Sequence, residues 1–159
     1  MLSKSMVLSA NQVSIQTLYE ALINDDIEIK DIDHDNNVIT VEISELKINI
    51  SFFNGGLCIN IPKHINNVDA YENVSNTIIE LNNSDIMFHL EAHKTSSIDI
   101  NQLLANNFDN VRKRIYVSAQ HKIFYMYFLS LEDFTYQLKN LAIQYKEIWG
   151  KILNASYKE

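Results

Sequence analysis

The sequence contains a single cysteine, a single proline and three glycines in 159 residues. Because Cys58 is alone, no disulfide can form within the chain, and a reducing compartment is indicated. The scarcity of glycine and proline leaves little material for flexible linkers. We therefore expect one domain over residues 1–159, in which only residues 1–10 are flexible.

Long hydrophobic runs are also missing. No run approaches the 18 apolar residues that indicate a membrane-spanning helix, so we expect no membrane partner. The apolar run within Met1–Ala10 is too short for a signal peptide. Together with the unpaired cysteine, these absences predict a cytoplasmic protein.

Basic residues are scarce as well. The 13 Lys and Arg residues face 20 Asp and Glu residues, which gives a formal net charge of −7. Because nucleic-acid binding depends on neutralising phosphates, we expect no nucleic-acid partner for so acidic a chain. The basic cluster Arg112–Arg114 is short and adjoins an expected strand. An acidic surface suits solubility or a basic protein partner.

The strongest pattern that is present runs from Ser130 to Asn154. Its apolar residues recur at alternating spacings of three and four, which is the period of one helix face. These residues are Leu131, Phe134, Leu138, Leu141, Tyr145, Ile148 and Ile152. Ser130 is placed to cap the first turn, and Asp133 to return the bond. We expect this long apolar face to pack against a sheet formed by the preceding strands.

The first half of the chain predicts a helix over Gln12–Ile23 and then an antiparallel meander. Apolar and polar residues alternate in short stretches that are separated by turn-forming residues. The expected strands are Ile27–Lys30, Ile39–Ile43, Leu46–Phe52 and Leu57–Ile61, with turns at Asp33–Asn37 and Asn54–Gly56 and with Pro62 as the end of the meander.

The second half is less regular. Val68–Leu81 has helical spacing but also allows a strand at Thr77–Leu81, and we favour the helix. The other expected elements are a strand over Ile86–Leu90, a short helix over Ile100–Phe108, a strand from Ile115 that turns at Ala119–Lys122, and a central strand over Ile123–Leu129 covered on both faces.

These elements predict an α+β fold. An antiparallel β-sheet, made of a meander plus a strand pair, packs against an N-terminal helix and the long C-terminal helix. Residues 62–98 form an apparent insert in this order.

Candidate metal-binding groups are few. His89 and His93 flank Glu91, and two histidines four residues apart can share a zinc ion on a helix. The local alternation instead places all three on the polar face of a strand. We expect a solvated face and no metal.

An acidic segment and the cysteine offer two further candidates. Asp31, Asp33, Asp35 and Asn37 resemble the start of a calcium loop, but Val38 stands where that loop requires glycine. A hairpin turn is favoured. Cys58 has no evident catalytic base, which favours a structural role. We therefore expect neither an enzyme nor a cofactor.

Aromatic residues are concentrated between Phe124 and Trp149. One strand and one helix face can bury only part of them, and the remainder would form an interaction surface. The predicted contact residues are Trp149, Tyr136, Tyr125 and Tyr127, and the acidic turn residues Asp33 and Asp35 supply a second candidate contact.

The order of elements resembles a known group. The helix Ser14–Ile23, the acidic turn between two strands and the strand Leu46–Phe53 look like the first half of YbjN-type proteins. The second half is matched by several later segments. These are the helix Ile100–Phe108, the strand pair Arg114–Val117 and Ile123–Phe128, and the helix from Glu132 through Trp149.

Type III secretion chaperones are similar in architecture, size and acidity. The resemblance implies a non-enzymatic protein that binds other proteins, often as a dimer, and it carries no catalytic residues over to this chain.

Three hypotheses follow. The first is a protein-binding adaptor or secretion-chaperone-like regulatory protein, for which a homodimer stays open. The alternative is an acidic inhibitor or immunity protein that blocks a partner enzyme or nucleic-acid-binding protein through the acids between Asp25 and Asp35. The third is a metal-dependent enzyme that uses His89 and His93.

Overall fold

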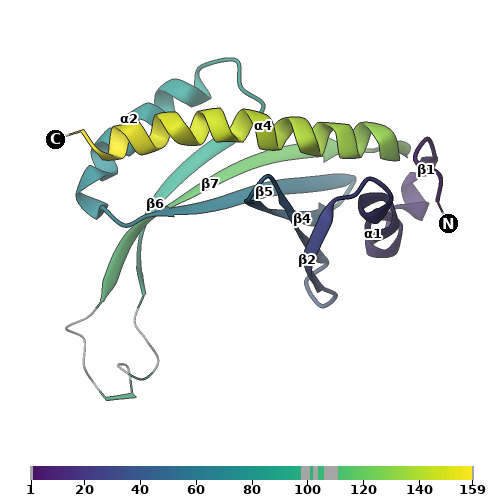
Figure 1. The fold of residues 1–159 in the computed structure, drawn as a ribbon, viewed down its shortest axis with the longest axis horizontal. Helices are drawn as coiled ribbons and strands as arrows, with labels where there is room; N and C mark the ends of the chain where they lie inside the picture. The colour runs from purple at the N-terminus through teal and green to yellow at the C-terminus, as the bar shows by residue number, and fades with distance from the viewer. Residues whose placement is uncertain (1, 98–100, 102–103, 106–110, 159) are drawn as a thin grey trace. The chain divides into compact units, whose positions relative to one another are not determined.

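The computed structural model describes residues 2–97, 101, 104–105 and 111–158. Within these ranges it contains helices and strands in the order shown in Figure 1. The helices are η1 (Ala10–Gln12), α1 (Ile15–Asn24), η2 (Val68–Ala70), α2 (Tyr71–Asn82) and α4 (Leu131–Ser156). The strands are β1 (Val7–Ser9), β2 (Glu28–Asp33), β3 (Val38–Ile43), β4 (Leu46–Phe53), β5 (Gly56–Ile65), β6 (His89–Ser97), β7 (Arg112–Phe124) and β8 (Phe128–Ser130).

The main sheet confirms the predicted α+β class. Its strand order is β2-β3-β4-β5-β7-β6, and β1 and β8 form a separate pair. Strands β2 to β5 are the expected antiparallel meander, in which Val41 lies opposite Ile48 and Ile50 opposite Ile59. The predicted turn between β4 and β5 is also present, and Gly55 takes a φ of 89° there.

By their contacts, the residues fall into two compact units. The first unit is Met1–Ile61 with Gln120–Lys146, and the second is Pro62–Ala119 with Glu147–Glu159. We describe each unit by itself. The expected single domain and the apparent insert at 62–98 stay predictions. Within residues 1–10, which we expected to be flexible, Val7–Ser9 form β1.

The long C-terminal helix is present as α4, and its predicted apolar face is confirmed. The residues of that face are 0–3% exposed: Leu131, Phe134, Leu138, Leu141, Tyr145, Ile148 and Ile152. The Ser130 hydroxyl accepts a hydrogen bond from the Asp133 backbone N–H at 3.2 Å, as a helix N-cap should. In the first unit, Leu18 and Leu22 of α1 are fully buried too.

In the second unit, residues 68–81 are helical, and the alternative strand at Thr77–Leu81 does not form. The amide side chain of Asn82 at the end of α2 exchanges two hydrogen bonds with the backbone of Leu90, at 2.8 and 2.9 Å. This exchange satisfies backbone groups of β6, an outer strand of the sheet. Strand β6 begins three residues later than predicted and extends to Ser97.

The prediction that Pro62 ends the meander is wrong. Strand β5 continues through Pro62 to Ile65. Proline lacks a backbone donor, so it is tolerated in a strand only where no ladder bond is required. The pairing of β4 with β5 ends at Asn60, so Pro62 lies beyond it.

The predicted turn at Ala119–Lys122 is also wrong, because β7 runs unbroken to Phe124. Buried Ile115, Val117, Ala119 and Ile123 keep the two-residue period of a strand. No residue between them supplies a turn. As a consequence, residues 123–129 do not form a covered central strand. The helix expected over Ile100–Phe108 lies mostly outside the described residues.

The β3–β4 turn has an unusual backbone. Ser44 and Glu45 have φ values of 51° and 66°, in the left-handed region. Glycine or asparagine normally occupies such positions, since other residues are strained there.

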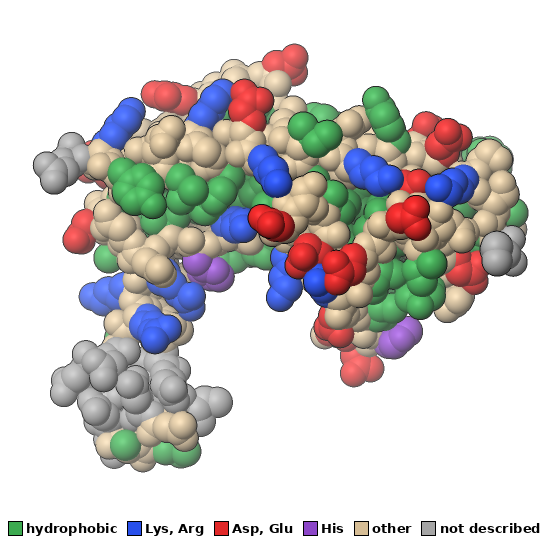
Figure 2. All heavy atoms as spheres, in the orientation of Figure 1, with side chains coloured by type: hydrophobic (Ala, Val, Ile, Leu, Met, Phe, Trp, Pro, Cys, Tyr) green, Lys and Arg blue, Asp and Glu red, His purple; other side chains and the backbone are tan. Residues whose placement is uncertain are grey.

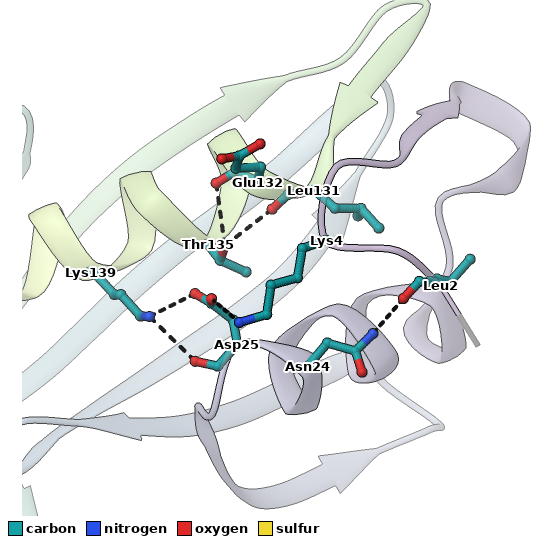
Figure 3. Close-up of polar contacts among 8 residues, drawn as sticks. All are labelled: Leu2, Lys4, Asn24, Asp25, Leu131, Glu132, Thr135 and Lys139. Atoms are coloured by element: carbon teal, nitrogen blue, oxygen red, sulfur yellow. Dashed lines mark hydrogen bonds and ion pairs between the residues drawn. The ribbon is translucent and has the colours of Figure 1, made fainter.

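An ionic contact joins α1 to α4 within the first unit (Figure 3). Asp25 at the end of α1 pairs with Lys139 at 2.7 Å and with Lys4 at 3.3 Å. The Lys139 Nζ also donates to the Asp25 backbone carbonyl at 3.3 Å. Hydrogen bonding from Lys139 is the main reason that the pKa of Asp25 is lowered, against an opposing effect of burial.

This contact predicts a pH-dependent loss of stability. Because the pKa of Asp25 is lower in the fold than its ordinary 3.8, its contribution is present above that pH and is lost as the pH falls through the lowered value. Asp25→Asn should therefore lower the free energy of unfolding by about 1 kcal/mol at neutral pH and by less in acid. Urea titrations near neutral pH and near pH ~3 measure this difference.

The matched control is Asp26→Asn, since Asp26 is the exposed next residue. It should change little at either pH. A difference between wild type and Asp25→Asn that is the same in acid as at neutral pH would contradict the assignment.

Candidate partner-binding surface

The segment that links β7 to β8 is anchored by its backbone. The Tyr125 N–H donates to the Gly55 carbonyl at 3.0 Å, and the Tyr127 carbonyl accepts from the Ala10 N–H at 2.8 Å. Directly after it, β8 pairs with β1, so that Leu129 lies opposite Leu8. The segment is thus held at both ends by the first unit.

Four large apolar side chains, on this segment and at the strand ends that flank it, are exposed to solvent. Phe124, Met126, Tyr127 and Phe128 are 68%, 73%, 72% and 68% exposed. We call these four residues the aromatic cluster. Its neighbours Tyr125 and Leu129 are 8% and 5% exposed, so they anchor the segment in the core.

Further apolar groups adjoin the cluster. The Phe124 ring packs edge-on against Phe53 with 5.4 Å between the centroids, and Lys122 Nζ lies 5.6 Å from the same Phe53 ring. On β1, which pairs with β8, Val7 is 56% exposed. The apolar surface therefore extends beyond the four residues.

Single exposed apolar residues are ordinary on protein surfaces, but four large ones in five consecutive positions are not. Fully burying one such side chain contributes about 1.5–3 kcal/mol. Interface cores are enriched in aromatic residues and methionine, which is the composition of this cluster. The arrangement is suited to contact with another molecule rather than to a reaction.

A second apolar pair lies on α4 in the same unit. Tyr136 and Ile143 are 66% and 69% exposed. They are seven residues apart and so share one side of the helix, away from its buried face. Tyr136 was predicted as a contact residue from its position off the buried face, and its exposure is consistent with that role.

The other predicted aromatic contacts differ in accessibility. Tyr127 is a member of the aromatic cluster. Tyr125 is buried, and burial also raises the pKa of its hydroxyl, so little of its side chain is left for a partner. Trp149 is half-buried and belongs to the second unit.

The predicted acidic contacts lie in the β2–β3 turn. The Asp33 carboxylate accepts hydrogen bonds from the backbone N–H groups of Asp35 and Asn36, both at 3.0 Å. It also accepts from the Asn36 side-chain amide at 2.7 Å, and these Asn36 bonds lower the pKa of Asp33. Asp33 therefore shapes the turn, whereas Asp35 is exposed and free for contact.

Sequence reasoning looked for contacts along the strand Ile123–Leu129, but it expected that strand to be covered and did not single out Phe124, Met126 or Phe128. A continuous apolar run indicates a strand covered on both faces, and nothing within it marks a loop. The available signal lay outside the run: the alternation before it carries β7 to Phe124, which leaves the following residues to make the connection to β8.

The residues considered for metal binding or nucleophilic chemistry lie on strands β6 and β5. His89, Glu91 and His93 lie on the exposed side of β6, as predicted, with each ring Nε2 3.3–3.4 Å from a Glu91 carboxylate oxygen. Within the described ranges, no group of three His, Cys, Asp or Glu is arranged to hold a metal ion. Burial raises the pKa of the half-buried Cys58 thiol, which opposes thiolate formation.

None of the helices in the described part of the chain has the length and apolar content needed to cross a membrane.

Comparison with known proteins supports the α+β class, because a solved protein combines a long helix with an antiparallel sheet in a similar arrangement. No protein-family model matches the chain. No curated protein matches it either. One similar solved structure is that of YbjN from E. coli, described as a candidate transcription regulator. It matches with a TM-score of 0.59 and 11% identity over 90% of this chain and 91% of that chain. The chain therefore has a YbjN-like fold.

Proposed function

We propose that this chain is a non-enzymatic protein that binds a partner polypeptide through the aromatic cluster. The exposure of Phe124, Met126, Tyr127 and Phe128 on an anchored segment carries the proposal. Because the backbone is held on both sides, little conformational entropy would be lost when a partner buries these side chains. A YbjN-like fold is consistent with a protein that acts through another protein.

In finer terms, we propose a cytoplasmic adaptor or secretion-chaperone-like regulatory protein. An apolar side-chain cluster could receive either a partner helix or an extended segment, which are both common modes of peptide recognition. A second copy of the chain is one such partner, and it would make the protein a homodimer.

Site-specific cross-linking tests this proposal. A photoreactive phenylalanine analogue replaces Tyr127, and the control carries it at Tyr157, an 80% exposed tyrosine of the second unit. In cells of the organism of origin, we expect position 127 to form a discrete cross-linked product that position 157 does not form. Mass spectrometry identifies the attached polypeptide, or a second copy of this chain.

A double variant measures how much the aromatic cluster contributes to partner affinity. Met126→Ser with Tyr127→Ser removes two exposed apolar side chains and should weaken partner binding more than tenfold, since each contributes about 1.5–3 kcal/mol when buried. Ile79→Ser, at a 58% exposed residue of α2, should not weaken it. Equal binding by both variants, or equal cross-linking at both tyrosines, would contradict the proposal.

The exposed acids of the β2–β3 hairpin favour a second candidate, an inhibitor or immunity protein that binds a basic partner. Asp31 and Asp35 are exposed and project from the hairpin that Asp33 shapes. In that case Asp31→Lys with Asp35→Lys should abolish the complex, and added salt should weaken it steeply. An apolar contact through the aromatic cluster should survive both changes.

A further inference from the structure

The second unit carries a basic surface that the net acidity of the chain conceals. On β7, Ile115 and Val117 are fully buried, so Arg112, Arg114 and Tyr116 alternate onto the opposite face of the sheet. By the same alternation, His64 of β5 and Thr95 of β6 lie on that face, since Ile65 and Leu90 are buried.

Two contacts join residues of this group across neighbouring strands. The rings of His64 and Tyr116 are 5.3 Å apart. The Thr95 hydroxyl donates to the Arg114 carbonyl at 3.3 Å. Burial and the nearby Arg114 charge both lower the pKa of His64. We call His64, Thr95, Arg112, Arg114 and Tyr116 the basic face.

The two arginines lack acidic partners among the residues that the structure describes, where no ion pair involves either of them. The Glu91 carboxylate on this side of β6 contacts His89 and His93 instead. The Arg114 Nε is buried without a hydrogen-bond partner. A shallow hollow beside the arginines is lined by Asn66, Arg112, Lys113 and Arg114, all of which can donate hydrogen bonds.

Figure 2 shows this concentration of charge. Blue Lys and Arg side chains gather where β6 ends and β7 begins, and a purple His lies close by. The net charge of −7 of the whole chain therefore does not describe this region.

We propose that the basic face binds a segment of single-stranded nucleic acid. Arg112 and Arg114 are two residues apart on one strand, which places their stems about 7 Å apart, comparable to successive phosphates of an extended nucleic-acid backbone. Guanidinium groups pair with phosphate oxygens through two parallel hydrogen bonds. Tyr116, next along the same face, offers a ring on which a base stacks.

An acidic peptide would satisfy the arginines but would leave the aromatic rings without a stacking partner. Cations beside aromatic rings on a sheet face form the combination used by proteins that bind single strands. The acidity of the rest of the chain opposes binding at long range, but ions of physiological salt screen that repulsion beyond about 8 Å. This inference is independent of the aromatic cluster and of the proposed protein partner.

Fluorescence anisotropy of the full chain with a labelled oligo(dT) or oligo(U) of about a dozen nucleotides tests the proposal. We expect binding that weakens as salt rises, with a slope of about −0.7 for each phosphate neutralised. Arg112→Glu with Arg114→Glu should reduce affinity at least about tenfold. Lys151→Glu with Lys158→Glu makes the same charge change elsewhere in the second unit, and it should reduce affinity less than about twofold.

Further variants keep the result interpretable if Arg114 is needed for folding. Arg112→Ala alone, at an exposed residue, should weaken binding several-fold, as should Tyr116→Ala. Absence of oligonucleotide binding by the wild type would overturn the proposal. So would equal losses in the two double-charge variants, or binding of polyglutamate or anionic phospholipid vesicles in place of the oligonucleotide. The expectation that this acidic chain binds no nucleic acid would then stand.

Discussion

Gly56→Ala is expected to destabilise the first unit by about 3 kcal/mol, because no space exists for a methyl group. A Cβ built on Gly56 would lie 2.5 Å from the Ile123 carbonyl oxygen and closer still to Cζ of Phe53. The carbonyl belongs to the backbone of β7 and cannot rotate away. Since Phe53 packs against Phe124, the same change should also displace part of the aromatic cluster.

Urea unfolding of three glycine variants measures this effect. Gly150 lies in α4 with nothing within 4 Å of its added Cβ, so Gly150→Ala should stabilise the protein by about 0.5–1 kcal/mol. Gly55 also has open space but a φ of 89°, so Gly55→Ala should cost about 1 kcal/mol through backbone strain. A Gly56→Ala variant as stable as the wild type would show that β5 and β7 are not packed as closely as described.

Phe134→Ala should have an even larger effect, about 3–5 kcal/mol. Phe134 is fully buried on the apolar face of α4, and truncation would leave a cavity as well as remove apolar contact. A loss of this size is a large fraction of the stability of a typical domain.

Ile143→Ala on the same helix is the control, since its side chain is 69% exposed and should contribute less than about 0.5 kcal/mol. The difference between the two variants in urea unfolding reports burial rather than helix propensity. Similar losses for both would mean that the buried and exposed faces of α4 are assigned incorrectly.

The extent to which sequence predicted the fold depended on how repetitive each pattern is. The buried face of α4 repeats through seven apolar residues, so a wrong assignment would require every one of them to be misplaced. The alternation in β3 and β4 was predictable for the same reason. Such patterns reflect burial of one apolar face, and removing apolar surface from water is the main driving force of folding.

The errors fell where a local signal depends on pairing that sequence does not show. Proline usually ends a strand, but Pro62 lies past the last residue that pairs with β4. The polar residues after Ala119 suggested a turn when the sequence was considered alone. The length of β7 is instead set by its neighbours in the sheet. Neither fact can be obtained from one strand considered alone.

The candidate sites show the same division. The exposure of Tyr136 followed from its position away from the buried apolar face of α4. The exposure of Met126 depends instead on where β7 ends and β8 begins. The basic residues Arg112 and Arg114 were visible in the sequence. That they form no ion pair with a described carboxylate could be known only once the strands were placed in the sheet. Net charge averages over the whole chain and does not reveal a local group of basic residues.

The backbone of Ser44 and Glu45 has a consequence for how the strand register is specified. A glycine-containing loop promotes its own reversal of direction, as at Gly55, whereas two ordinary residues held at positive φ oppose theirs. The six residue pairs that join β3 to β4 must offset this local strain. Alignment of the two strands is therefore imposed by cooperation along the ladder, and the loop follows it.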